Sequence, residues 1–173
     1  NLEEVYVPYY KYIDIERYNG HLSSGQRYYP LVVEYGCPFR CNFCFNSMGN
    51  TPRGRTPESV IEEIKVAMER YRPKEIMLMS ENLLSKPSWT KRFCELIGQN
   101  GLQFRWIAAG HANTVNEDML RLVKRHGCYK IGIGFENFSQ KILDNMNKRV
   151  KVETYRRVLQ LIRKHSFAYT GTM

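Results

Sequence analysis

The chain has 173 residues, 43% of them hydrophobic and 13% aromatic, and a formal net charge of +9. This composition is that of one globular domain with its own core, and it excludes a chain that is disordered throughout. No apolar run approaches the roughly 20 residues that cross a bilayer, and the aromatic, mixed-charge start does not resemble a signal peptide. We therefore expect a cytoplasmic protein with no membrane partner.

The excess of positive charge raises the hypothesis of RNA binding. Much of the excess lies between Lys148 and Lys164. These charges are spread around a predicted helix that already has an apolar face, and such runs are usually solvated. RNA therefore remains only a less favoured partner.

Residues 1–30 differ from the rest of the chain. They contain seven tyrosines mixed with Pro, Gly and Ser, without a sustained helical or strand period. We expect an irregular lead-in or linker that packs on a domain formed by residues 31–173.

Short apolar runs alternate with amphipathic stretches after Pro30, which is typical of repeated βα units around a parallel sheet. This pattern predicts an α/β fold. Each run is apolar enough to be buried on both faces, as parallel strands usually are. The predicted strands are Leu31–Tyr35, Glu75–Ser80, Gln103–Ala109, Tyr129–Phe135 and Phe167–Met173.

The helices between these strands carry their own start and stop signals. Thr56 is a predicted N-cap and is followed by a first-turn proline and acid, and Asn116 predicts the start of a helix that ends at Gly127. Apolar residues at helical spacing predict further helices around Trp89–Ile97, after Ser139 and over Glu153–His165.

Three of the five cysteines, Cys37, Cys41 and Cys44, fall within eight positions. This is a poor layout for a disulfide framework, and clustered thiolates suit iron-sulfur clusters, copper(I) or zinc. Cys94 and Cys128 lie in predicted apolar elements, so we expect them to be small buried residues without chemistry.

The cysteine loop follows the first predicted strand, at the carboxyl end where parallel α/β proteins build their sites. Three thiolates on four irons leave one iron that a small molecule with an amine and a carboxylate can chelate. A zinc-stabilised, non-catalytic binding module is the alternative. It would need a fourth ligand such as His111 or His126, and structural zinc sites usually show two pairs of cysteines.

The motif from Cys37 to Cys44, with Phe43 before the last cysteine, resembles the CxxxCxxC signature of radical S-adenosylmethionine (radical SAM) enzymes. From Val32 to Met173 the order of elements also resembles that superfamily's partial (β/α)6 TIM-like barrel. The resemblance implies a [4Fe–4S] cluster that donates one electron to S-adenosylmethionine, yielding a 5′-deoxyadenosyl radical that abstracts hydrogen from a substrate. The superfamily's barrel continues beyond a fifth strand, so we expect this chain to be a fragment.

The resemblance further implies cofactor-binding residues, although it assigns no catalytic residue. Phe43 would lie near the adenine. Ser80 and Glu81 stand where the superfamily has a Gly-Gly-Glu motif that binds the methionine amine. Glu136 follows a buried strand and matches an acid that reaches the ribose hydroxyls. His111 occupies a place where relatives often have arginine, and it either faces a carboxylate or is structural.

Arg53 and Arg55, in the loop after the cysteines, are either substrate contacts or solvated charges. The lead-in resembles the linker that follows a cobalamin-binding domain in one branch of the superfamily. We therefore expect a radical SAM core of that branch, which cleaves S-adenosylmethionine or supports cobalamin-dependent methyl transfer to a small-molecule substrate. Its electron donor would be a flavodoxin or ferredoxin. The second hypothesis is a tRNA-modifying methylthiotransferase, which the charge favours and the lack of an appended RNA-binding module disfavours.

Overall fold

The computed structural model describes residues 27–172, together with the isolated positions 3, 8, 11, 12, 14 and 17. Most of the predicted lead-in, and Met173, therefore lie outside the described residues. Within the described part no helix is long and apolar enough to span a bilayer.

Five parallel strands form one sheet in the order β1-β4-β5-β6-β7. Because each new strand is added beside the preceding one, the sheet grows in one direction, as in a TIM-like barrel, rather than reversing as in a doubly wound fold. The predicted α/β fold of partial-barrel type is confirmed. The strands are β1 Tyr28–Val32, β4 Glu75–Met79, β5 Arg105–Gly110, β6 Cys128–Gly134 and β7 Ala168–Thr172.

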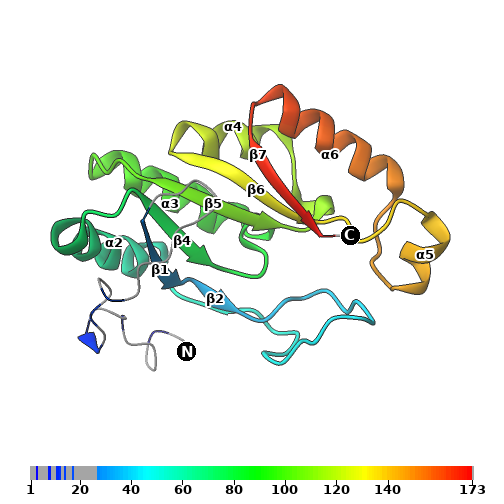
Figure 1. Ribbon diagram of the computed structural model, residues 1–173, viewed down its shortest axis with the longest axis horizontal. Coiled ribbons are helices and arrows are strands. Elements are labelled where there is room, and N and C mark those ends of the chain that lie inside the picture. Colours follow the sequence, from blue (N-terminus) through cyan, green and yellow to red (C-terminus); the bar gives the residue numbers. More distant parts are fainter. Residues whose placement is uncertain are drawn as a thin grey trace.

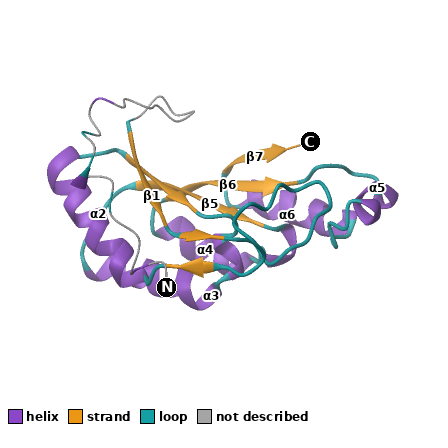
Figure 2. Ribbon diagram, turned by 90° about the horizontal axis from the view of Figure 1, so that it is seen from below, coloured by secondary structure: helices purple, strands orange, loops and turns teal. Residues whose placement is uncertain are grey.

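The helices cover one face of this sheet, as Figures 1 and 2 show. Their local signals act as predicted: the Thr56 side chain accepts from the N–H of Ser59, and the Asn116 side chain accepts from that of Met119. The α-helices are α2 Pro57–Tyr71, α3 Pro87–Gln99, α4 Glu117–Arg125, α5 Gln140–Asn145 and α6 Val152–Lys164, and two 3₁₀ turns are η3 Leu83–Ser85 and η4 Ala112–Thr114.

The prediction that every strand is buried on both faces is wrong. In β5, Trp106, Ala108 and Gly110 are buried, whereas Ile107 and Ala109 are partly exposed. Residues 168–171 of β7 are exposed. The cause is the placement of the helices, which cover one face and leave the other as the concave side of a partial barrel (Figure 2).

The first predicted strand, Leu31–Tyr35, combines two elements. The sheet strand β1 begins at Tyr28 and ends at Val32, after which β2 (Glu34–Tyr35) pairs antiparallel with β3 (Arg53–Gly54) in a separate two-stranded sheet. The chain leaves the main sheet here because the segment between β2 and β3 forms the cysteine loop, residues 36–52. Figure 1 shows this loop reaching from β2 toward α5.

Candidate functional site

The cysteine loop closes on itself at its base. Gly36 has φ +87°, and a Cβ there would lie 2.7 Å from the carbonyl oxygen of Thr51, so only glycine fits. The N–H of Cys37 donates to the carbonyl of Gly49 at 3.2 Å, and Asn50 Nδ2 donates to the carbonyl of Phe39 at 3.0 Å. These contacts gather three cysteines into one short loop.

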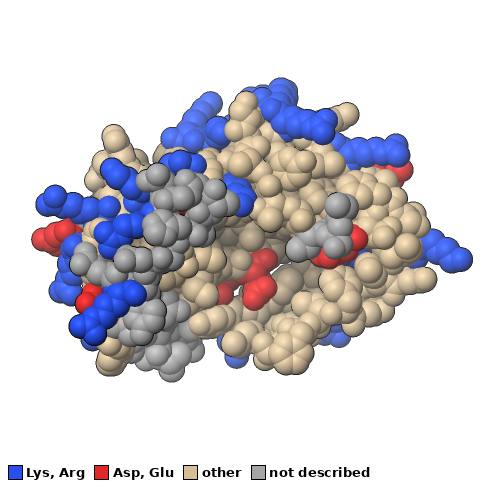
Figure 3. All heavy atoms as spheres, viewed as in Figure 1, with Lys and Arg blue, Asp and Glu red and all other residues tan. Residues whose placement is uncertain are grey.

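The three cysteines line a cavity of about 220 Å³ at the carboxyl ends of β4, β5 and β6. Four of the predicted cofactor residues, Phe43, Glu81, His111 and Glu136, line the same cavity, and Ser80 lines an adjoining one of about 420 Å³. On the face in Figure 3, carboxylates gather in the central hollow, and Lys and Arg lie mostly around the outline. The full lining is Cys37, Phe39, Cys41, Phe43, Cys44, Glu81, Asn82, Gly110, His111, Gly134, Glu136 and Lys148.

A lysine that the sequence did not point to lies in this cavity. Lys148 is 8% exposed, its Nζ lies 3.3 Å from Glu136 Oε1, and it is 5.6 Å from the centre of the Phe43 ring. The prediction that Lys148 belongs to a solvated helical face is wrong, because Lys148 precedes α6 in the turn after α5. Glu136 itself has φ 61°, a left-handed conformation that is uncommon outside glycine and is often found at functional sites.

His111 lines the cavity and is held in place by three contacts with the protein. Its ring stacks on Phe39 with centroids 3.8 Å apart. Nδ1 accepts from the N–H of Asn113 at 3.3 Å, so Nε2 carries the proton and donates to the carbonyl of Lys148 at 3.1 Å. Burial, followed by the charge of Lys148, lowers the pKa of His111 to about 4, so the ring is neutral at pH 7.

Asn82 is a second residue of the cavity that the sequence did not single out. It is 2% exposed, and its Oδ1 accepts from the N–H of His111 at 2.8 Å. Its buried Nδ2 has no hydrogen-bond partner among the described residues, a costly arrangement unless a ligand accepts from it. Its place next to Glu81 was the only signal in the sequence.

Ser80 directs its hydroxyl away from the cavity of the cysteines. Ser80 Oγ donates to Glu34 Oε1 at 2.6 Å, and the buried carboxylate of Glu34 also pairs with Lys86. The hydroxyl of Ser80 is therefore already engaged by the protein.

Arg55 is neither a substrate contact nor a solvated charge, the two alternatives predicted for it. Arg55 is 5% exposed, forms an ion pair with Glu63, and donates to the carbonyl of Val32 at 3.2 Å. Tyr29 donates to the other oxygen of Glu63 at 2.9 Å. This is a buried structural network. Arg53 is exposed and donates to the carbonyl of Met48 within the cysteine loop, at 2.8 Å.

The three thiols of the loop are a donor set that fits an iron-sulfur cluster. Within the described part of the chain, no three His, Cys, Asp or Glu side chains are grouped as ligands of one ion. In a cluster each thiolate binds a different iron, so one short loop can supply all three. Burial raises the pKa of Cys37 and Cys41, so cluster assembly has to displace their protons. The buried Nδ2 of Asn82, which has no hydrogen-bond partner among the described residues, also fits a cavity that holds a polar ligand.

Cys94 and Cys128 are buried, as predicted, with 0% and 1% exposure. Burial raises the pKa of each thiol to about 12. Both are therefore inert, protonated core residues at neutral pH.

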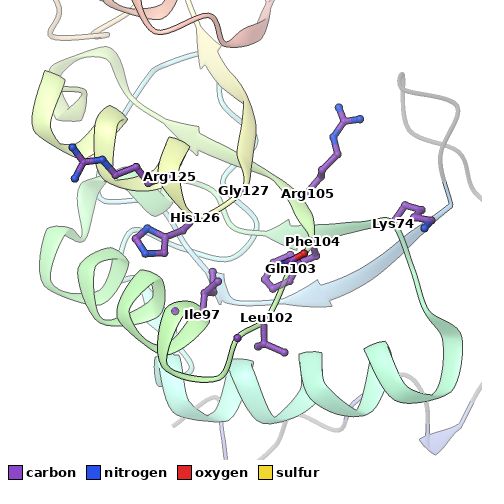
Figure 4. A pocket seen from close by; sticks show the side chains of 11 residues that line it. Lys74, Ile97, Leu102, Gln103, Phe104, Arg105, Arg125, His126 and Gly127 are labelled. Atoms are coloured by element: carbon purple, nitrogen blue, oxygen red, sulfur yellow. The ribbon is translucent and has the colours of Figure 1, made fainter.

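A larger cavity of about 790 Å³ lies at the opposite, amino-terminal end of β5 (Figure 4). Its cationic side chains Lys74, Arg105 and Arg125 point away from one another, and Arg105 instead pairs with Glu75 and covers the ring of Tyr129. Binding sites combine an apolar wall with convergent polar groups, which this cavity lacks. The cavity beside the cysteines is the candidate site.

Two curated proteins are similar in sequence to most of the chain. The chain is 30% identical over 152 residues to "Uncharacterized methyltransferase PH0819" of Pyrococcus horikoshii, covering 87% of this chain and 32% of that protein. It is 25% identical over 173 residues to the anaerobic magnesium-protoporphyrin IX monomethyl ester cyclase of Synechocystis sp., covering 98% of this chain and 34% of that protein. The chain thus spans about a third of the length of these relatives.

Solved structures share the fold at lower identity. The cobalamin-dependent radical SAM enzyme OxsB, with aqua-cobalamin and S-adenosylmethionine bound, matches with a TM-score of 0.78 at 18% identity, over 91% of this chain and 24% of its own. The radical SAM methyltransferase TsrM from Kitasatospora setae matches with a TM-score of 0.77 at 14% identity, over 92% and 32%. The profile of the Radical SAM superfamily matches residues 31–173, which include the whole cysteine loop and every strand from β4 onward. The chain therefore belongs to the radical SAM superfamily of enzymes.

Proposed function

We propose that this chain is the cofactor-binding core of a radical SAM enzyme, in which Cys37, Cys41 and Cys44 hold a [4Fe–4S] cluster and S-adenosylmethionine occupies the cavity beside them. The observation that carries the proposal is that the three thiols of one loop line the same cavity as two carboxylates and one buried lysine. When bound, the cluster and S-adenosylmethionine together supply radical chemistry through one-electron cleavage of a carbon–sulfur bond.

The charges of the cavity complement the methionine part of S-adenosylmethionine, which carries an ammonium and a carboxylate. Glu81 offers an acceptor for the ammonium, with the Ser80 carbonyl beside it. Lys148 and the orphaned Nδ2 of Asn82 offer donors to the carboxylate, and such charge-assisted bonds contribute about 1.5–3 kcal/mol each.

The remaining predicted residues have different roles in this proposal. Glu136, oriented by Lys148, accepts from the ribose hydroxyls, and Phe43 lies near the adenine. His111 positions other groups rather than binding the cofactor, because both of its ring nitrogens already bond to the protein.

Anaerobic reconstitution with iron and sulfide tests the proposal. We expect about four irons per chain and a broad absorbance in the visible blue, both lost in Cys41→Ser. Cys94→Ala is the matched control and should retain the cluster, because Cys94 lies in the helical core rather than in the loop. Stoichiometric zinc with no iron uptake would instead support the binding-module alternative.

We further propose that the whole protein acts on a small molecule and binds cobalamin through a part outside this chain. Support comes from the names of similar proteins: OxsB is described as cobalamin-dependent, and curated relatives are named as a methyltransferase and a cyclase. An electron donor of the flavodoxin or ferredoxin type would serve it. If the full-length protein retains hydroxocobalamin through gel filtration, the result supports this proposal. If hydroxocobalamin separates from the protein, the proposed binding of cobalamin is wrong.

Two observations favour a second candidate, a tRNA-modifying methylthiotransferase. The chain is 23% identical over 171 residues to a putative methylthiotransferase of Helicobacter pylori, and its net charge is +9. A tRNA-modifying enzyme would bind tRNA with a steep dependence on salt. Measuring tRNA retention between low and physiological salt separates this candidate from an enzyme of small molecules.

A further inference from the structure

The turn that follows α5 contacts both the cysteine loop and the cavity. We define the α5–α6 turn as residues 146–149 together with Asn145, the last residue of α5; within it Asn147 has φ 52° and Arg149 has φ 54°. Asparagine adopts this left-handed conformation more readily than most residues, whereas arginine does so at a cost. Inside the turn, Arg149 Nε donates to Asn147 Oδ1 at 3.1 Å, and the N–H of Lys148 donates to the carbonyl of Leu143 at 3.0 Å.

Three hydrogen bonds join the α5–α6 turn to the cysteine loop, across more than a hundred residues of sequence. Asn147 Nδ2 donates to the carbonyl of Arg40 at 2.6 Å. The N–H of Asn42 donates to the carbonyl of Met146 at 3.0 Å, and Asn42 Nδ2 donates to that of Asn145 at 2.9 Å. Arg40 and Asn42 are the two neighbours of Cys41, so the turn fixes the backbone on both sides of the middle cysteine.

The same turn also bonds to the wall of the cavity. The carbonyl of Lys148 accepts from His111, and the carbonyl of Arg149 accepts from Asn113 Nδ2 at 2.8 Å. The side chain of Lys148 continues into the cavity and reaches Glu136. A displacement of the turn would therefore move Cys41 and Lys148 together.

We propose that the α5–α6 turn is a latch that sets the position of Cys41 relative to the cofactor cavity, with Asn42 and Asn147 as positioning residues. The proposal rests on the proposed function for what the loop and the cavity hold. Each hydrogen bond of the latch restricts a loop that otherwise bonds mainly to itself, and a typical bond of this kind corresponds to about a fivefold change in population. A ligand that engages Lys148 and Glu136 would hold the turn in place and thereby slow the loss of a cluster bound through Cys41.

Site-resolved alkylation of the metal-free chain tests the latch without any cofactor. Asn147→Asp keeps the acceptor for Arg149 and the tolerance for positive φ, and replaces the donor to Arg40 with a carboxylate oxygen, which also adds a negative charge. Asn42→Ala removes the second side-chain bond without any change of charge. We expect Cys41 to react with iodoacetamide about fivefold faster in either variant, with a smaller change at Cys37. Asn100→Ala is the matched control, because Asn100 Nδ2 makes a similar bond to the carbonyl of Leu96 at the end of α3.

The buried Cys94 and Cys128 report unfolding in the same experiment. A rate at Cys41 equal to that of the control, or a rise that Cys94 and Cys128 share, would overturn the latch. Asn147→Gly provides a second variant, because glycine adopts the turn conformation and lacks the donor.

Iron release from the reconstituted chain to a chelator then tests whether the turn couples a ligand in the cavity to retention of the cluster. In the parent, S-adenosylmethionine should slow the release, and Asn147→Asp should weaken that protection about fivefold. Unchanged protection in Asn147→Asp, with normal iron content, would overturn the latch and leave the proposed function standing. Failure of the parent to take up iron would overturn the proposed function, while the alkylation result would still decide the latch.

Discussion

Nζ of Lys148 lies 3.3 Å from Oε1 of Glu136, and both atoms lie against Gly134 at the end of β6. The pair places a cation and an anion in the wall of the cavity of the cysteines. In the proposed function the ligand replaces each partner of this pair: its carboxylate accepts from Lys148, and its ribose hydroxyls donate to Glu136.

Neutralising either partner should weaken cofactor binding and leave the cluster intact. In the reconstituted chain, we expect Lys148→Met and Glu136→Gln each to weaken S-adenosylmethionine binding by about 10- to 100-fold, because each loses a charge-assisted hydrogen bond worth about 1.5–3 kcal/mol. Equilibrium binding and iron content are the measurements, with the exposed Lys151→Met as control. Loss of iron in Glu136→Gln would show that Glu136 is structural.

Gly134 should tolerate no side chain if the pair is to keep its geometry. A Cβ at this position would lie 2.5 Å from Glu136 Oε1 and 3.0 Å from Lys148 Nζ, both at the ends of flexible side chains. We expect Gly134→Ala to change the free energy of unfolding by less than about 1 kcal/mol, since those ends can move, while S-adenosylmethionine binding falls about tenfold. Gly132→Ala is the control, because its Cβ would make only ordinary contacts at 3.8 and 4.0 Å. Equal binding by the two variants would contradict the prediction.

The buried pair of Arg55 and Glu63 should contribute to stability and not to chemistry. Arg55→Met leaves the carboxylate of Glu63, itself 3% exposed, without its charged partner, and breaking such a pair costs about 3–5 kcal/mol. Urea unfolding measures this loss. Arg53→Met, at an exposed site, should change the free energy of unfolding by no more than about 0.5 kcal/mol. A similar small change in Arg55→Met would refute the assignment.

The neutral His111 should make the fold sensitive to mild acid. Its pKa is about 4 in the folded chain against 6.5 for the ordinary side chain, so between these values the unfolded chain binds the extra proton. Stability from this group is therefore complete above pH 6.5 and falls as the pH decreases toward 4. Urea unfolding at pH 7 and pH 5 should show a larger loss in the parent than in His111→Gln. Equal losses in the two proteins would rule out this source of acid sensitivity.

The local signals of the sequence were sufficient for the α/β repeats and for the cysteine loop. Thr56 and Asn116 cap their helices through bonds to residues three positions ahead, and the spacing of Cys37, Cys41 and Cys44 is a property of one short segment. Glu81 was expected only from the resemblance to the superfamily, and Glu136 from that resemblance and from its place directly after a buried strand, at the carboxyl edge of the sheet. The roles of Phe43, Ser80, Glu81 and Glu136 in cofactor binding remain predictions.

Only the tertiary structure decided which charged residues enter the core. Lys148 was predicted to be solvated and Arg55 to be either a substrate contact or a solvated charge. Lys148 instead lies in the cavity, and Arg55 pairs with Glu63 and bonds to the carbonyl of Val32. The sequence likewise shows neither that Asn82 Nδ2 has no hydrogen-bond partner among the described residues nor that Asn147 bonds to the cysteine loop. The physical reason is that burial and pairing depend on contacts between segments far apart in the chain, and those contacts exist only once the strands have set the distances between loops.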